Sequence, residues 1–191
     1  MKKSDKRDDI IRVSLELIAE HGFHGVPMAK IAEQAGVGAG TIYRYFESKD
    51  VLINELHREL EEKIRATLLE TYPAERPLRE RFLYLTRKIL RYFIANPLHL
   101  RYMEQYFNSP YGISKHRDRL LGKSDKQDIV MDIFKQGMEE QILKEFPKAV
   151  LFSLSFGPLV FLMRDHVLGF IVLDEALIEQ TTEACWDAIK R

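Results

Sequence analysis

Residues 28–46 read MAKIAEQAGVGAGTIYRYF, and this stretch decides the fold of the N-terminal part of the chain. Its apolar residues have the spacing of two short helices that bury one small shared core. They are Ile31, Ala32, Ala35, Val37, Ile42 and Tyr45. Gly36 lies between the two patterns, where a left-handed residue must turn the chain. The stretch therefore predicts a helix-turn-helix, in which the second helix is presented to the major groove of DNA.

The charge of the chain gives this prediction no support. The sequence has 29 basic and 29 acidic residues, for a formal net charge of +0, and the first 50 residues are balanced as well. Nucleic-acid-binding domains usually carry a basic excess. The prediction of DNA binding must therefore depend on the motif and on where the charges are placed.

The cysteine content, the first nine residues and the apolar segments of the chain indicate the cellular compartment. Cys185 is the only cysteine among 191 residues, so no disulfide forms within the chain, which fits a reducing compartment. The first nine residues, MKKSDKRDD, lack the apolar segment of a signal peptide. Residues 149–163 are almost entirely apolar but are shorter than the roughly 20 residues of a membrane span. We therefore expect a cytoplasmic protein.

Helical spacing of apolar residues recurs along the whole chain. It predicts helices over approximately the following residues: 8–21, 28–35, 39–46, 48–68, 78–95, 102–107, 125–144, 147–168 and 174–190. We expect residues 108–124 to form a loop that includes at most one short helix. Residues 170–173 are too few and too isolated to pair as a strand. The fold class is predicted to be all-α, with a three-helix DNA-binding domain at 1–50 and a helical ligand-binding and dimerisation bundle at 51–191.

The last two predicted helices suggest a dimer. A helix that is apolar on every side, as over residues 149–163, has to be covered on every side. The helix that follows it is amphipathic, and one face of it carries Leu177, Ile178, Thr181, Cys185 and Ile189. Two copies of this pair would make a four-helix interface. The alternative is a central helix in a monomeric bundle.

Motifs for catalysis or for cofactor binding are weak. Residues 36–41, GVGAGT, resemble a phosphate loop, but they follow a helix and lack the lysine of a P-loop. His21 and His24 have metal-ligand spacing without a second pair nearby in sequence. No nucleophile elbow and no HExxH occurs. We therefore predict no cofactor, no metal and no enzymatic activity, and the alternative is an all-α enzyme or carrier.

Aromatic and methionine residues in the middle of the chain are most simply core, but a subset could line a ligand cavity, because ligand pockets are mostly apolar. The candidate lining residues are Phe82, Tyr92, His99, Tyr102, Met103, Tyr106, Phe134 and Phe156. The polar groups that would orient a ligand are His99, Arg101, Glu104 and Arg164.

Three segments resemble the TetR/AcrR family of bacterial transcriptional regulators. They are residues 31–37, IAEQAGV; residues 40–46, GTIYRYF; and residues 48–52, SKDVL. The resemblance covers about the first 55 residues. Members of this family combine such a segment with a divergent C-terminal domain that binds ligand and dimerises.

The resemblance implies a recognition helix at 39–45, in which Thr41 and Tyr43 contact DNA. Tyr45 would face either the DNA backbone or the small core, and Lys49 would contact a phosphate. The implied DNA-binding residues are Lys30, Ala39, Gly40, Thr41, Tyr43, Arg44, Tyr45 and Lys49. Val26-Pro27 and Gly38 stand where the family often has Thr and Ser hydroxyls.

The resemblance also implies that the protein binds a double-stranded, near-palindromic DNA operator as a homodimer. A largely apolar small molecule would release it from the operator, and its simplest role would be that of a repressor. The alternative is a DNA-binding protein that responds to no ligand.

Overall fold

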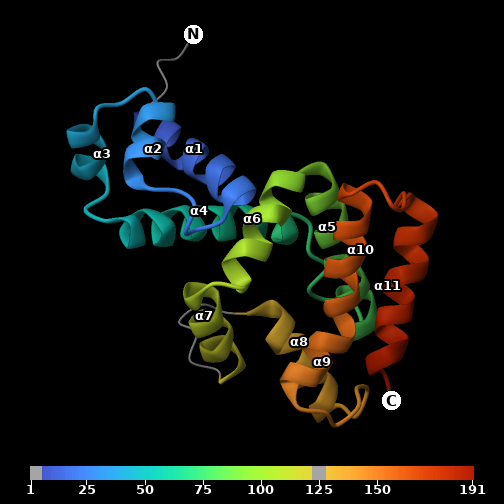
Figure 1. The fold of residues 1–191 in the computed structure, drawn as a ribbon. Coiled ribbons are helices and arrows are strands. Elements are labelled where there is room, and N and C mark those ends of the chain that lie inside the picture. Colours follow the sequence, from blue (N-terminus) through green and yellow to red (C-terminus); the bar gives the residue numbers. More distant parts are fainter. Residues whose placement is uncertain (1–5, 122–127) are drawn as a thin grey trace. The chain divides into compact units, whose positions relative to one another are not determined.

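The computed structural model describes residues 6–121 and 128–191. Apart from one isolated bridge between Leu143 and Lys190, helices are the only regular structure in these ranges (Figure 1). They are α1 (Lys6–His21), α2 (Met28–Gln34), α3 (Ala39–Tyr45), α4 (Lys49–Leu69), α5 (Leu78–Ala95), α6 (Pro97–Phe107), α7 (Pro110–Leu120), α8 (Ile129–Glu139), α9 (Lys148–Ser155), α10 (Gly157–Val167) and α11 (Glu175–Ile189). The prediction of an all-α fold is confirmed.

Helix α7, 11 residues long, lies in the segment where a loop with one short helix was expected, and it takes up most of the described part of that segment. Ser109 caps it, because its Oγ accepts from the backbone N–H of Gly112 at 3.3 Å, and Pro110 suits a first helical position, where no N–H is needed. Gly112 is a glycine because a Cβ there would lie 2.1 Å from the backbone oxygen of Tyr106. Pro110 and Gly112 therefore start a helix and pack it closely against α6.

The helix predicted over residues 147–168 is two helices. α9 ends at Ser155 and α10 begins at Gly157, with Phe156 between them. Pro158, in the first turn of α10, has no N–H with which to continue the hydrogen bonds of α9. The first part of the helix predicted at 125–144 lies outside the described residues, and its described part, α8, ends at Glu139.

The chain forms two compact units. The first unit comprises Met1–Arg65 and Pro97–Ile113, and the second unit comprises Ala66–Asn96 and Ser114–Arg191. A functional boundary after residue 50 stays a prediction, because compactness alone does not assign DNA or ligand binding to a unit.

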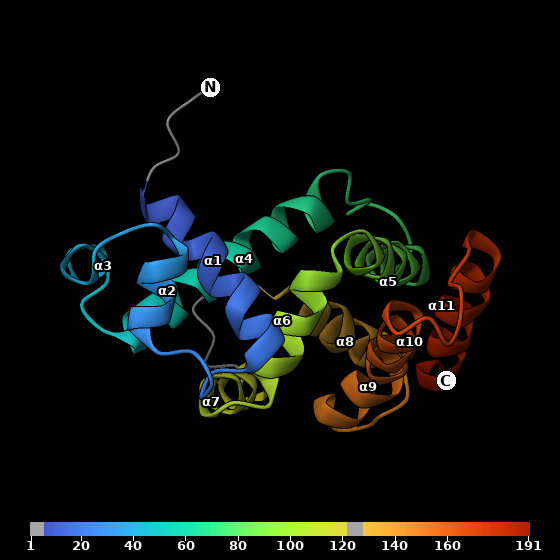
Figure 2. The same cartoon turned by 45° about the horizontal axis from the view of Figure 1, so that its top comes forward.

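The core of the first unit joins the N-terminal helices to α6. Helix α1 packs along α6, as Figure 2 shows. The ring of Phe23, which follows α1, meets Tyr102 and Tyr106 of α6 edge-on at 6.0 and 6.3 Å between centroids. His57 of α4 is stacked on Tyr106 at 3.5 Å. Helix α6 is therefore part of the support for the N-terminal helices.

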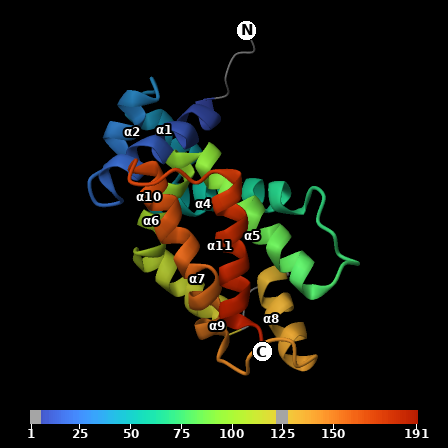
Figure 3. The same cartoon turned by 90° about the vertical axis from the view of Figure 1, so that its right-hand side faces the viewer.

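The second unit is built around α5, α10 and α11. Helices α10 and α11 lie side by side, and both contact α5 (Figure 3). Phe82 of α5 contacts Phe156 at 6.1 Å and Trp186 of α11 at 5.5 Å between ring centroids. In this unit Ile178, Cys185 and Ile189 are buried. Ile178 and Ile189 are therefore core of their own subunit, whereas Cys185 also lines a groove on the surface of the unit. The dimer through the last two helices stays a prediction.

The turn between α2 and α3 gives a stability prediction. Gly36 has a φ of +65°, and no neighbouring atom would touch a Cβ there. Gly36→Ala should therefore lower the free energy of unfolding by about 1–2 kcal/mol through backbone strain alone. Urea denaturation measures the change.

Gly40→Ala is the matched control. Gly40 lies within α3 and also has open space at its Cβ position. There alanine should raise the free energy of unfolding by about 0.5–1 kcal/mol, because it restricts the unfolded chain more than glycine does. Changes of the same sign at both positions would contradict the role assigned to the turn.

Candidate nucleic-acid interface

Helices α2 and α3 are held together by a small buried core. Ile31, Ala32, Ile42 and Phe46 are each at most 2% exposed. Between the helices, the backbone N–H of Val37 donates to the carbonyl oxygen of Ala32 at 2.9 Å. The two helices are therefore fixed in a helix-turn-helix arrangement.

Tyr45 does not take the core position that its spacing suggested. Its side chain is 42% exposed, whereas Phe46, the next residue, is 1% exposed. The backbone leaves the helical conformation at Phe46, with a φ of −136° and a ψ of 106°. This change of direction turns Phe46 inward and leaves Tyr45 on the surface.

The outer face of α3 carries most of the residues predicted to contact DNA. Tyr43 is 55% exposed, Ala39, Gly40 and Arg44 are exposed, and Thr41 is half-buried. Lys30 of α2 is half-buried as well. No side chain caps α2 or α3 at its N-terminus, in keeping with the absence of hydroxyl residues at positions 27 and 38. One face of α3 is thus open to a partner, while Ile42 anchors the other.

The start of α4 is fixed by two side chains in succession. The ammonium group of Lys49 donates to the backbone oxygen of Phe23, and burial lowers the pKa of Lys49. The hydroxyl of Tyr111, at the start of α7, donates to Oδ1 of Asp50. This hydrogen bond, together with burial and the charge of Asp50, raises the pKa of Tyr111 to about 12. The contact between Lys49 and a phosphate stays a prediction, and it would use the other donors of the ammonium group.

Arg7 ties α1 to the same helix. Its guanidinium lies 3.2 Å from Oε2 of Glu55 and 2.6 Å from Oε1 of Glu59. It also lies 5.6 Å from the centroid of the Phe46 ring. Arg7 therefore contacts both α4 and the residue at which α3 ends, and Tyr111 contacts the start of α4. Neither residue was predicted from the sequence. The four-residue spacing of Glu55 and Glu59 was a signal for a basic partner, whereas nothing in the sequence indicated Tyr111.

Comparison with known proteins places this geometry in a family. Residues 10–56 match the family described as bacterial regulatory proteins, tetR family. Residues 77–190, more than half of the chain, match the family described as tetracyclin repressor-like, C-terminal domain. The chain belongs to the TetR family.

Relatives of similar length are TetR-family regulators. A helix-turn-helix transcriptional regulator of Haemophilus influenzae is 28% identical over 190 residues, which cover 99% of this chain and 98% of the relative. The solved structure of a TetR-family transcriptional regulator from Vibrio parahaemolyticus is 35% identical, with a TM-score of 0.78 over 98% of this chain and 99% of that one.

The Bacillus subtilis regulator FadR, solved in complex with stearoyl-CoA, shares the fold. It is 21% identical, with a TM-score of 0.73 over 95% of this chain and 98% of that one. Because this chain belongs to the TetR family, its helix-turn-helix is the DNA-binding element of a transcriptional regulator.

The residues predicted to line a ligand pocket are divided between the two units. His99, Tyr102, Met103 and Tyr106 lie in the first unit, and Tyr102 and Tyr106 are buried there. The hydroxyl of Tyr102 has no hydrogen-bond partner among the described residues, and burial raises its pKa. Burial, together with the charge of Lys63, lowers the pKa of His99.

The remaining four pocket candidates lie in the second unit. Phe134 contacts Phe156, which contacts Phe82, whereas Tyr92 pairs with Phe93. Trp186 completes this aromatic cluster and was not predicted to belong to it. The assignment of a ligand pocket to these residues stays a prediction.

The apolar segment before α11 is longer than the sequence analysis allowed. Lys148–Val167, 20 residues, is long and apolar enough to cross a membrane by length and composition, and 28% of its apolar window is buried. It is weak evidence for a span, because helices of soluble proteins pass the same test and this one is interrupted at Phe156.

Among the described residues no group of three or more His, Cys, Asp or Glu could hold a metal ion.

The hydrogen bond between Tyr111 and Asp50 gives a prediction for this interface. Tyr111→Phe should lower the free energy of unfolding by about 0.5–1.5 kcal/mol, the usual net contribution of one hydrogen bond. Urea denaturation measures the change.

A double-mutant cycle is the control for this hydrogen bond. In an Asp50→Ala background, Tyr111→Phe should cost almost nothing more, because the acceptor is already absent. Costs that simply add would show that the hydroxyl does not act through Asp50.

Proposed function

We propose that this TetR-family regulator binds a near-palindromic operator as a homodimer, acts in the cytoplasm as a repressor, and is released by a small molecule. The observation that carries the proposal is the exposed outer face of α3, fixed by the burial of Ile42 and Phe46 beneath it. Two such helices, one from each subunit, would enter successive major grooves of the operator.

The chemistry of α3 suggests how it would recognise the operator. Ala39 and Gly40 have no side chain that forms hydrogen bonds, so they can lie close to the bases and favour contact with a thymine methyl group. Thr41, Tyr43 and Arg44 supply the polar contacts on the same helix. With so few base-reading groups, the shape of the DNA and the spacing of the two helices would supply much of the specificity.

DNA titration tests the site. Duplexes from the region upstream of the gene, with unrelated DNA as competitor, are titrated at several salt concentrations. Lys49→Ala should weaken binding to all sequences and reduce the slope of log K against log salt by about one per subunit, because one phosphate contact is lost. Tyr43→Ala should weaken operator binding more than competitor binding.

Lys135→Ala is the charge-matched control. Lys135 is 67% exposed on α8, in the second unit, and its removal should leave both the affinity and the slope unchanged. Unchanged affinity in the Tyr43 and Lys49 variants would contradict the assignment of the DNA-binding residues.

The dimer proposal is supported by an apolar groove on the second unit. Leu154, Pro158 and Leu162 form one side of it, while α11 contributes small residues on the other. The small residues are Thr181, Ala184, Cys185 and Ala188, and Gln180 of α11 lines the groove as well. Nearby, Phe161 of α10 is 62% exposed. Small side chains allow the close approach of helices, so the same groove of a second subunit fits here as a four-helix interface.

Ala184→Arg should disrupt this dimer. Ala184 is exposed in the groove, and an arginine there would place a charge and a long side chain between the helices. Sedimentation equilibrium at micromolar concentration should show a dimer for the natural chain and a monomer for the variant.

Ala66→Arg controls for the substitution itself, because Ala66 is exposed on α4 and lies outside the groove. It should remain dimeric. A natural chain that is monomeric at micromolar concentration would overturn the dimer proposal.

A largely apolar effector is the remaining part of the proposal. It is supported by FadR of Bacillus subtilis, which shares the fold and was solved with stearoyl-CoA. A coupling of about 1–3 kcal/mol between effector and DNA would change operator occupancy about 5- to 150-fold.

A further inference from the structure

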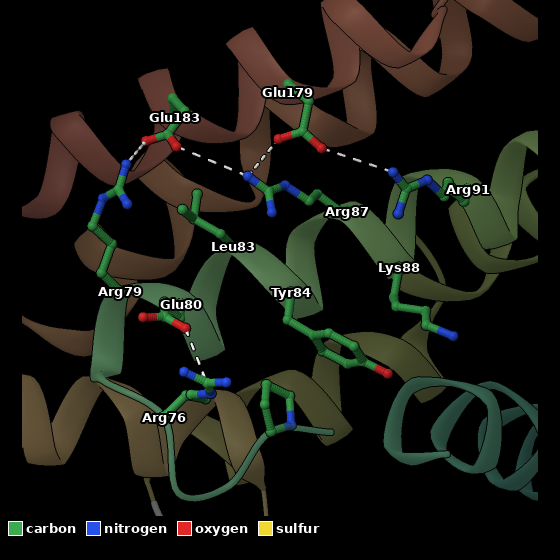
Figure 4. Close-up of a pocket in the computed structure, with 11 residues that line it drawn as sticks. Arg76, Arg79, Glu80, Leu83, Tyr84, Arg87, Lys88, Arg91, Glu179 and Glu183 are labelled. Atoms are coloured by element: carbon green, nitrogen blue, oxygen red, sulfur yellow. Dashed lines mark hydrogen bonds and ion pairs between the residues drawn. The ribbon is translucent and has the colours of Figure 1, made fainter. Parts of the chain in front are cut away.

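A groove of about 470 Å³ lies on the surface of the second unit, and neither the DNA-binding face nor the dimer groove includes it. It is bounded by α5, by α11 and by the segment that precedes α5 (Figure 4). Five cationic side chains and three carboxylates line it. Its volume falls within the range of small-molecule sites, and its lining has an excess of positive charge.

One wall of the groove is fixed by ion pairs between α5 and α11. Arg79 lies 2.5 Å from Glu183, and Arg87 pairs with Glu179. Arg91 lies 2.5 Å from Glu175, just outside the groove. The carboxylates of α11 are therefore already engaged by arginines, and this wall is close to neutral.

The other part of the groove carries the cations that are left. Lys88 has no ion pair within residues 6–121 and 128–191, and its ammonium group lies 5.7 Å from the centroid of the Tyr84 ring. The guanidinium of Arg76 is 69% exposed and reaches Glu80 only at 4.0 Å. Figure 4 shows the ring of Tyr84 between Arg76 and Lys88. The positive charge of the groove is thus concentrated on both sides of an aromatic ring.

The ring of Tyr84 is held in place. Its hydroxyl forms a hydrogen bond with Oγ1 of Thr71 at 2.8 Å, and Tyr72 meets it edge-on at 5.9 Å between centroids. Arg81 in turn donates to the hydroxyl of Tyr72 at 2.8 Å. A fixed aromatic ring loses little entropy when a planar group packs against it, so it is suited to bind one.

We propose that this groove binds a nucleoside phosphate, with the phosphate oxygens on Arg76 and Lys88 and the base against Tyr84. Guanidinium groups pair with phosphate through two parallel hydrogen bonds, while lysine acts as a point charge. Bases stack on aromatic side chains whatever their identity. The ligand can be a free nucleotide or the nucleotide end of a coenzyme A thioester, because both present this chemistry.

Calorimetric titration of the full-length protein without DNA tests the proposal independently of the proposed operator binding. The probes are ADP, coenzyme A, adenosine and inorganic phosphate. ADP or coenzyme A should bind saturably, and at least tenfold more tightly than adenosine or phosphate alone. If coenzyme A binds and ADP does not, the natural ligand is a coenzyme A thioester. If ADP binds and coenzyme A does not, the natural ligand is a free nucleotide.

Variants locate the binding site. Arg76→Gln combined with Lys88→Gln should weaken binding of the tighter probe by more than tenfold, because two charge-assisted hydrogen bonds are lost. Lys135→Gln, a distant lysine on α8, should leave it unchanged. Tyr84→Leu should weaken binding, whereas Tyr84→Phe, which keeps the ring but loses its hydrogen bond to Thr71, should weaken it much less.

Circular dichroism shows whether each variant is folded, and only the affinities of folded variants are compared. Absence of saturable binding by both ADP and coenzyme A would overturn the proposal. An unchanged affinity of the folded double variant for the tighter probe would also overturn it. Inorganic phosphate that binds as tightly as ADP and coenzyme A would do the same.

Discussion

The burial of Ile42 and Phe46 is the constraint on which the DNA-binding face depends. Ile42 is the only residue of the short helix α3 that is fully buried, and a helix of this length is not stable alone in water. Its orientation is therefore set by one anchor within it and by a second, Phe46, directly after it. Whatever moves the surface on which these two side chains pack also moves the exposed residues of α3.

That surface is built from distant parts of the sequence. Phe23, His57 and Tyr106 come from different segments and meet in one aromatic cluster of the first unit. Arg7 and Tyr111 then connect α1 and α7 to α4. Ile42 and Phe46 belong to the same hydrophobic core as Phe23 and Tyr106, so the helix-turn-helix is packed together with α6 in the first unit.

Much of the fold followed from periodicity, and the errors have physical causes. The helix-turn-helix was predictable because its signals, the apolar spacing and the turn glycine, are local. Tyr45 was misplaced because the spacing assumes a continuous helix, and the chain leaves the helix at Phe46. The extent of helix α7 was underestimated because Pro110 and Gly112 were counted as helix breakers. The hydrogen bond from Tyr111 to Asp50 joins residues 61 apart, and no local pattern encodes such a pair.

The charge balance of the chain also has a structural explanation. Many carboxylates of the first unit are engaged by arginines away from α3, as Glu55 and Glu59 are by Arg7. Neither Lys30 nor Arg44 forms an ion pair with any other described residue. Although the net charge of the chain is zero, Lys30 and Arg44 are therefore not neutralised by a neighbouring carboxylate in the part of the chain that the structure describes.

The burial of Cys185 has a chemical consequence. Burial raises the pKa of its thiol to about 11, so almost none of it is ionised at neutral pH. Oxidants and electrophiles attack the thiolate form, which is scarce here. Cys185 is the only cysteine of the chain, so at neutral pH the chain offers very little thiolate for a peroxide or an aldehyde to react with.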